Sequence, residues 1–135
     1  MSLSTNKVLV KTFVEDVFNK HDTSATERYF AKENPPIESE GFKQSLSAHF
    51  KAFPDIQAKI EHKVSENDII VVFLNFTGTN KGEYQGRPST NKQVTTRSAD
   101  LYKIENEKIV EHWDVVDQLN LLQQTGKTLS QVNKK

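Results

Sequence analysis

Residues 108–117 read Lys108-Ile109-Val110-Glu111-His112-Trp113-Asp114-Val115-Val116-Asp117, and the fold can be inferred outward from them. The β-branched residues of this stretch favour an extended backbone, so it predicts a strand. Successive side chains of a strand point to opposite faces, which places His112 and Asp114 on one face and Glu111 and Trp113 on the other. An imidazole and a carboxylate on one face permit acid–base chemistry if that face lines a pocket. If the face meets water, they are only a solvated pair.

Three further strand-like segments precede this stretch, and polar turns join them. They span residues 56–64, 69–79 and 94–104. Residues 69–74 are apolar on both faces, so the second face of that strand needs cover from a helix or from another copy of the chain. In the first segment, Ile56, Ala58, Ile60, His62 and Val64 alternate with Gln57, Lys59, Glu61 and Lys63, as in a strand with one face in water.

Apolar residues at helical spacing predict three helices in the first part of the chain, over residues 6–20, 23–30 and 39–52. Pro35 and Pro36 make a loop before the third helix, because each proline removes a backbone donor and restricts the residue before it. A short apolar segment ends near Gly126, and residues 127–135 are expected to form a flexible tail. Helices followed by hairpin-linked strands indicate one α+β domain over residues 1–135. Its curved antiparallel sheet should hold the helices on the concave side, with a pocket between them.

Charge and composition exclude several classes of protein. Eighteen basic residues balance eighteen acidic ones, which removes the broad basic field of a nucleic-acid-binding protein. Cysteine is absent, so disulfides, thiolate catalysis and cysteine-bound zinc are excluded, and a reducing compartment fits. No apolar run approaches the ~20 residues of a membrane span, and no signal-type apolar core opens the chain. We expect a soluble, cytoplasmic protein whose partners include neither nucleic acid nor membrane.

Short motifs are spread along the chain from roughly residue 6 to residue 125. They are Phe13 to Asn19, Asn34-Pro35, Gly41-Phe42-Lys43, Phe53-Pro54-Asp55, Thr77-Gly78-Thr79, Gly82-Glu83, Lys92-Gln93-Val94, and Lys108 to Asp114 with Asp117. With the order of elements, they resemble the SnoaL-like polyketide cyclases, also named SnoaL-like ester cyclases, of the nuclear-transport-factor-2-like superfamily. That resemblance implies a cone-shaped α+β fold, in which a strongly curved antiparallel or mixed sheet packs around the N-terminal helices and leaves a deep apolar cavity. It also implies a homodimer formed through the outer face of the sheet.

The same resemblance implies a reaction. In the family, an aspartate of the last strand is the general acid and base of an intramolecular aldol cyclisation that needs no metal or cofactor. Asp114 matches that aspartate, and His112 and Asp100 match polar positions expected to face the same cavity. Such a reaction requires a base, a donor for the developing enolate oxygen and a dry site. A carboxylic acid enclosed by apolar side chains holds its proton more tightly, so Asp114 could take and return a proton, and a protonated Asp100 could be the donor.

This reading predicts a cyclase- or isomerase-type enzyme, or a hydrolase, that acts on a small apolar carbonyl or ester compound without a cofactor. The predicted substrate-binding residues are Tyr102, Ser98, Asn34, Glu33 and Phe50, with Asn75 as a further polar candidate. The sequence departs from the family at two places: Glu33 stands where a histidine is frequent, and Phe73 where an arginine is frequent. Because a fold does not fix a function, the alternative is a non-catalytic module that binds a small hydrophobic ligand or acts in dimerisation.

The other histidines and the tryptophan have structural interpretations. His49 lies on the apolar side of a predicted helix and is expected to be a hydrogen-bonded core residue, with a substrate role as the less favoured alternative. His21 and His62 are expected at the surface, and Trp113 is expected in packing, at a subunit contact. His112 and Asp114 offer two metal ligands where catalytic zinc takes three, so no metal site is expected. No Gly-x-Ser-x-Gly elbow occurs, which argues against a Ser-His-Asp hydrolase.

Overall fold

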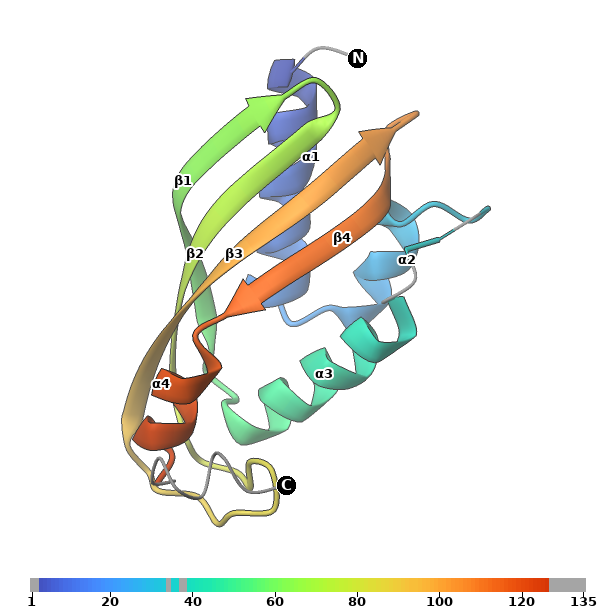
Figure 1. Ribbon diagram of the computed structural model, residues 1–135. Helices are drawn as coiled ribbons and strands as arrows, with labels where there is room; N and C mark the ends of the chain where they lie inside the picture. Colours follow the sequence, from blue (N-terminus) through green and yellow to red (C-terminus); the bar gives the residue numbers. More distant parts are fainter. Residues whose placement is uncertain (1–2, 34, 37–38, 127–135) are drawn as a thin grey trace.

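The computed structural model describes residues 3–33, 35–36 and 39–126 of the chain. Its elements are α1 (Leu3–Val14), the π-helix η1 (Glu15–Asn19), the 3-10 helix η2 (Thr23–Ala25), α2 (Thr26–Tyr29), α3 (Ser39–Ala52), β1 (Gln57–Glu66), β2 (Ile69–Thr79), β3 (Gln93–Glu105), β4 (Lys108–Val116) and α4 (Gln118–Gln124). The helical half precedes the strands (Figure 1), so the predicted α+β class is confirmed. The tail predicted for residues 127–135 lies outside the described residues. No helix in the described ranges is long and apolar enough to cross a bilayer.

Element boundaries agree with the sequence most closely at α3 and β2, whose predicted ranges are confirmed. The helix predicted over residues 6–20 is two elements, because α1 ends at Val14 and a π-helix follows. The helix predicted over residues 23–30 is a 3-10 turn followed by the single turn of α2. The wider turn of the π-helix buries two successive side chains, Val17 and Phe18.

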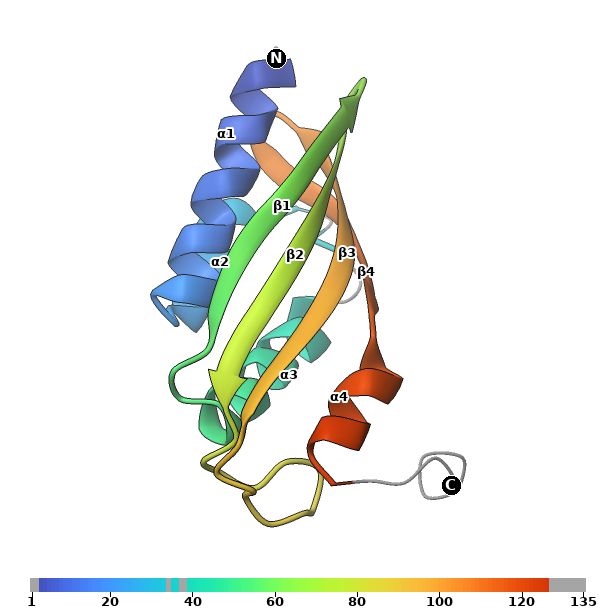
Figure 2. The same ribbon diagram turned by 90° about the vertical axis from the view of Figure 1, so that its left-hand side faces the viewer.

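The strands form one sheet in the order β1-β2-β3-β4, and every strand pair is antiparallel. α1 packs along one face of this sheet in both views, and no described helix covers the opposite face there (Figures 1 and 2). The register of β3 and β4 sets Asp100 opposite Asp114 and Tyr102 opposite His112. Side chains of directly opposed residues leave the sheet on the same face, so these four groups are neighbours.

A bulge changes which residues β1 buries. The pairing of β1 with β2 shifts register between Ile60 and His62. An extra residue on one strand reverses the alternation of faces beyond it. Ala58 is buried as predicted, but His62 is exposed and Val64 is 57% exposed. The alternation expected for this strand therefore fails at Val64, whereas the surface position predicted for His62 is confirmed.

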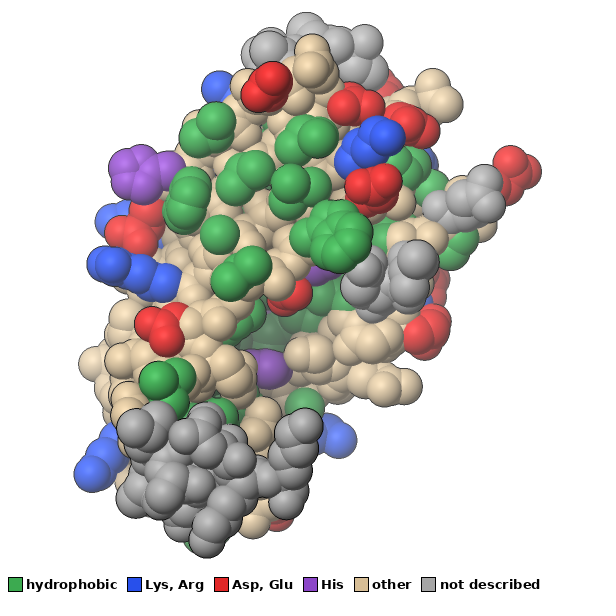
Figure 3. Space-filling model, viewed as in Figure 1, with side chains coloured by type: hydrophobic (Ala, Val, Ile, Leu, Met, Phe, Trp, Pro, Cys, Tyr) green, Lys and Arg blue, Asp and Glu red, His purple; other side chains and the backbone are tan. Residues whose placement is uncertain are grey.

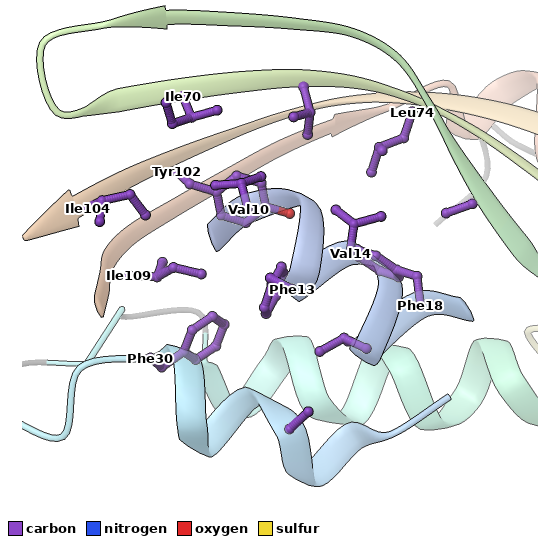
Figure 4. Close-up of a cluster of buried hydrophobic side chains, with 14 of the residues drawn as sticks. Val10, Phe13, Val14, Phe18, Phe30, Ile70, Leu74, Tyr102, Ile104 and Ile109 are labelled. Atoms are coloured by element: carbon purple, nitrogen blue, oxygen red, sulfur yellow. The ribbon is translucent and has the colours of Figure 1, made fainter. Parts of the chain in front are cut away.

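Phe13 of α1 occupies the centre of the main hydrophobic core, which fills the space between α1 and the sheet (Figure 4). Its ring has aromatic neighbours at centroid distances of 5.4–6.2 Å, namely Phe18, Tyr29, Phe30, Phe42 and Tyr102. A second cluster lies at the other end of the sheet and contains Phe53, Tyr84, Val94, Leu121 and Leu122. The last two belong to α4, so this helix closes the far end of the core.

The N-terminal helical segments bond to both edges of the sheet. At the β1 edge, the backbone N of Ala58 donates to Asn19 Oδ1 at 2.6 Å, and Asn19 Nδ2 donates to the Ala58 carbonyl at 3.0 Å. At the β4 edge, Phe30 forms an isolated parallel bridge with Ile109, and Ala31 N donates to the Ile109 carbonyl at 3.0 Å. Residues 19–31 therefore reach from one edge strand to the other.

Apolar side chains gather on the face of the sheet opposite α1 (Figure 3). We define this outer face by Val64, Val71, Phe73, Ala99, Leu101, Trp113 and Val115, which the strand register places side by side. Trp113 is 59% exposed there and Val115 is 73% exposed. The second face of β2 is thus apolar, and no described helix covers it.

The hydroxyl of Tyr29 links α2 to η1 and makes a testable contribution to stability. It donates to Asp16 Oδ2 at 2.6 Å, and this bond is the main cause that lowers the pKa of Asp16. A carboxylate with a lowered pKa stabilises the fold fully above its ordinary value of 3.8, and the contribution disappears as the pH falls through the lowered pKa. Tyr29→Phe should therefore cost about 1–2 kcal/mol at pH 7 in urea unfolding, and less near pH 3. A cost that stays constant from pH 7 to pH 3 would contradict this.

Candidate active site

A pocket of about 100 Å³ lies between α3 and the sheet, where β4 ends. Figure 3 shows the surface hollowed there. The wall is mainly apolar, and five of its side chains are phenylalanines, namely Phe18, Phe42, Phe50, Phe53 and Phe76. The polar side chains of the wall are Ser45, His49, Thr96, Ser98, Asp100 and Asp114. An apolar pocket with a few converging polar groups is the usual form of a small-molecule site.

Asp100 and Asp114 form a carboxylate pair on the sheet wall of this pocket. They stand directly opposite each other in the antiparallel pairing of β3 with β4, and both line the pocket. Cβ atoms of directly opposed residues are about 4.5–5.5 Å apart. Asp100 is buried, with 3% of its surface exposed, whereas Asp114 is exposed at the pocket mouth. The sequence therefore placed both carboxylates on the correct face of their strands.

Tyr102 and His112 contact the Asp100 carboxyl group from the side away from the pocket. The Tyr102 hydroxyl donates to Asp100 Oδ2 at 3.1 Å, and His112 Nε2 lies 3.7 Å from the same oxygen. The longer distance allows an ion pair but exceeds that of a hydrogen bond. The His112 ring stacks on Tyr102 with centroids 4.8 Å apart and meets the edge of Phe42 at the same distance.

This packing places His112 and Tyr102 behind the pocket wall. Neither is among the residues that line the pocket, and both are almost fully buried. His112 was expected beside Asp114 on the wall, and Tyr102 was expected to touch the substrate. Strand alternation gave the face correctly, but it could not show that Asp100 stands between these two rings and the pocket.

Burial raises the pKa of Tyr102 well above its ordinary value, and the charges of Asp100 and Asp114 add to the rise. Tyr102 therefore keeps its proton, and its hydroxyl remains a donor to Asp100 Oδ2. Among the described residues, Asp100 Oδ1 has no hydrogen-bond partner although it is buried. Buried polar atoms normally find a partner, so this oxygen is an unsatisfied polar atom in a residue that lines the pocket.

The predicted substrate-binding residues fall into three groups. Ser98 and Phe50 line the pocket, and the Ser98 hydroxyl is buried without a partner among the described residues. Glu33 is exposed and lies in a separate surface hollow beside Lys32 and Lys103, so the structure does not place it at the pocket. Asn34 lies outside the described residues. Asn75 is half-buried on β2 and does not line the pocket.

Two histidines differ from their predicted surroundings. His49 lines the pocket from α3, where it was expected to be a core residue, and its Nδ1 lies 2.7 Å from the Ser45 carbonyl. Its position three residues after Leu46 on the apolar side of the helix was the available signal. His21 was expected at the surface but is half-buried, because its ring stacks on Phe50 at 4.3 Å.

The described residues contain no group of three or more His, Asp or Glu side chains placed to hold a metal ion together. The chemistry that these residues themselves offer is proton transfer. Asp100 and Asp114 are the carboxyl groups that line the pocket from the sheet, and the rest of its wall is rich in phenylalanine.

Fold and pocket together define a class, that of small α+β proteins with an acid–base group in an apolar pocket. The sequence profile of the SnoaL-like polyketide cyclases matches residues 8–125 of this chain. The chain belongs to the SnoaL-like polyketide cyclase family, which has the nuclear-transport-factor-2-like fold. No protein with a curated description matches the sequence significantly.

Solved structures agree with this assignment. AclR from Streptomyces galilaeus, a candidate hydroxylase, is 26% identical, with a TM-score of 0.86 over 95% of this chain and 85% of its own. A candidate polyketide cyclase from Acidithiobacillus ferrooxidans is 26% identical, with a TM-score of 0.77 over 93% of this chain and 97% of its own. A candidate SnoaL-like polyketide cyclase from Jannaschia sp. CCS1 shares the fold at 17% identity, with a TM-score of 0.80 over 95% of this chain and 97% of its own.

Proposed function

We propose that this protein catalyses cofactor-independent acid–base chemistry on a small, uncharged carbonyl or ester compound, in the manner of an intramolecular aldol cyclisation. The observation that carries the proposal is the opposition of Asp100 and Asp114 on one wall of an otherwise apolar pocket. Among the described residues, no lysine or arginine lines that pocket, so an anionic compound would meet two carboxyl groups there without a lysine or arginine to pair with it.

The two carboxyl groups would have different roles. Ionised Asp114, at the mouth, removes a proton from the carbon next to the carbonyl. Protonated Asp100 donates from its free Oδ1 to the developing enolate oxygen, while Tyr102 holds Oδ2. The enolate carbon then attacks a second carbonyl of the same molecule to form the ring bond. Asp114 returns its proton to the new alkoxide oxygen, so atoms and charge balance without a co-reactant.

His112 would act in this scheme as a positioning residue. Its ring packs between Tyr102 and Phe42, and its Nε2 faces Asp100 Oδ2. A positive charge there would favour ionised Asp100, so the donor role of Asp100 requires neutral His112.

A compound screen tests the proposal. Small neutral ketones, esters and diketones would be tested for an increase in Tm, and each compound that raises it would be incubated and analysed by chromatography for an isomeric product. Binding in the pocket should raise Tm by several degrees at saturating concentration. Val116→Phe places a ring in the pocket and should abolish these shifts. Compounds that bind but are never converted would favour the non-catalytic binding module instead.

We also propose that two copies of the chain pair through the outer face. Seven contiguous apolar side chains there, with Trp113 59% exposed among them, form the kind of patch that is normally covered. Light scattering at micromolar concentration should give twice the mass of the chain, and Trp113→Glu should give the monomer. Glu111→Gln, on the same strand face, is the matched control and should remain dimeric. A monomeric wild-type protein would contradict the proposal.

A further inference from the structure

His49 on the helix wall faces the same pocket as the acid pair on the sheet wall, and its environment fixes where its proton lies. Nδ1 is 2.7 Å from the Ser45 carbonyl oxygen. A carbonyl oxygen only accepts hydrogen bonds, so Nδ1 carries a hydrogen and donates. In the neutral ring the other nitrogen, Nε2, is then an acceptor.

The partner of that acceptor is Tyr84, and the contact is weak. The Tyr84 hydroxyl lies 3.4 Å from Nε2, which is longer than an ordinary hydrogen bond. Tyr84 itself accepts from Gln118 Nε2 at 3.1 Å. Burial raises the pKa of Tyr84, so the hydroxyl keeps its proton. With Gln118 donating to its oxygen, that hydroxyl can give its hydrogen to His49 Nε2. Nε2 has a single lone pair, and this long contact with Tyr84 satisfies it poorly, so a better-placed donor on a molecule in the pocket could compete for it.

A second feature separates His49 from the acid pair. Within the described ranges, no hydrogen bond or ion pair joins His49 to Asp100 or Asp114, although all three line the pocket. A molecule in the pocket would lie between the two walls. It would meet carboxyl groups on one side and a neutral acceptor on the other.

We propose that His49 Nε2 binds a hydroxyl group of the ligand and that the ligand therefore carries a hydroxyl donor, such as a phenol or an enol, opposite the carbonyl that faces Asp100 and Asp114. This inference rests on the proposed function only in that both place the ligand in this pocket. His49 is a specificity residue here, and Tyr84 with Gln118 holds it in the accepting form.

The test uses two isosteric probes, p-cresol and p-xylene, which differ by a hydroxyl in place of a methyl group. Both would be titrated into the wild-type protein and into His49→Phe, with affinities taken from NMR shift changes. The wild type should prefer p-cresol, and His49→Phe should reduce that preference by about 3- to 10-fold, the value of one hydrogen bond. His49→Gln, which offers an amide oxygen as acceptor, should restore part of the preference. Ser47→Ala, exposed on the same helix, should leave it unchanged.

Several results would overturn the proposal. The first is an equal preference for p-cresol over p-xylene in the wild type and in His49→Phe. The second is the absence of saturable p-cresol binding by the wild type. The third is a neutral His49 whose nitrogen NMR signals at pH 8 show the hydrogen on Nε2. Asp114→Asn should keep the p-cresol preference even if it abolishes turnover. A preference lost in Asp114→Asn but kept in His49→Phe would place the hydroxyl at the acid pair and reject the role of His49. Failure of the proposed reaction therefore remains distinguishable from failure of this inference.

Discussion

Replacing Asp114 with asparagine is expected to lower kcat by about 10²- to 10⁴-fold for any compound that the wild-type protein isomerises, which is the usual contribution of a general base. Asparagine keeps the size of the side chain and removes its ability to take a proton. Asp114 is exposed at the pocket mouth and supports no element, so the fold should be unchanged. Product formation by chromatography gives kcat, and Tm by circular dichroism checks the fold.

Two matched variants make the result specific. Glu111→Gln removes a carboxylate from the opposite face of the same strand and should leave kcat within about twofold, because it cannot reach the pocket. Asp100→Asn keeps a hydrogen-bond donor at the same place, so its loss of activity should be smaller than that of Asp114→Asn. Unchanged turnover by Asp114→Asn would remove Asp114 from the mechanism. A larger loss of kcat for Asp100→Asn than for Asp114→Asn would make Asp100 the base and Asp114 the donor.

Replacing Phe13 with alanine is expected to cost about 3–5 kcal/mol of the free energy of unfolding, the largest stability effect that we predict. The side chain is fully buried, and its ring meets five aromatic neighbours. Removing it leaves a cavity that rings packed from several elements cannot readily close. Native proteins of this kind are stable by only about 5–15 kcal/mol, so the variant should unfold at a much lower urea concentration.

Two further substitutions separate cavity formation from a general effect of altering α1. Val8→Ala removes a side chain that is 62% exposed on the same helix and should change stability by no more than about 0.5 kcal/mol. Phe13→Leu keeps most of the volume and should cost much less than alanine. Equal costs for leucine and alanine at this position would contradict the cavity explanation. Phe13 also contacts Tyr102 and Phe42, so its loss should loosen the packing around His112.

The sequence predicted most where a single local rule was decisive. Ser39 and Pro54 bracket α3, and the long two-sided apolar run gives β2, so both ranges are confirmed. Strand alternation put Asp100 and Asp114 on one face, and the pairing of the last two strands followed from the short turn at residues 105–107. These features depend on neighbours in the chain, which a sequence displays directly.

The rest depends on contacts between distant segments. The bulge after Ile60 reverses the burial pattern of β1, yet nothing in the alternation of that segment marks it. His112 is held behind Asp100 by Phe42, which comes from a helix 70 positions earlier. His49 faces the pocket because of the way in which α3 packs against the sheet. The spacing of apolar residues and the secondary-structure propensities of the chain carry no information about such packing.

The bonds that residues 19–31 make to both rims of the sheet limit how this protein can assemble. An open β-strand edge is a template on which a foreign strand can add, and uncontrolled growth of that kind leads to fibres. Here the Asn19 side-chain amide is hydrogen-bonded to the backbone N and carbonyl of Ala58 on edge strand β1. The backbone N of Ala31 donates to the carbonyl of Ile109 on edge strand β4. Lateral strand addition is obstructed at these points, whereas no described helix covers the outer face of the sheet (Figures 1 and 2).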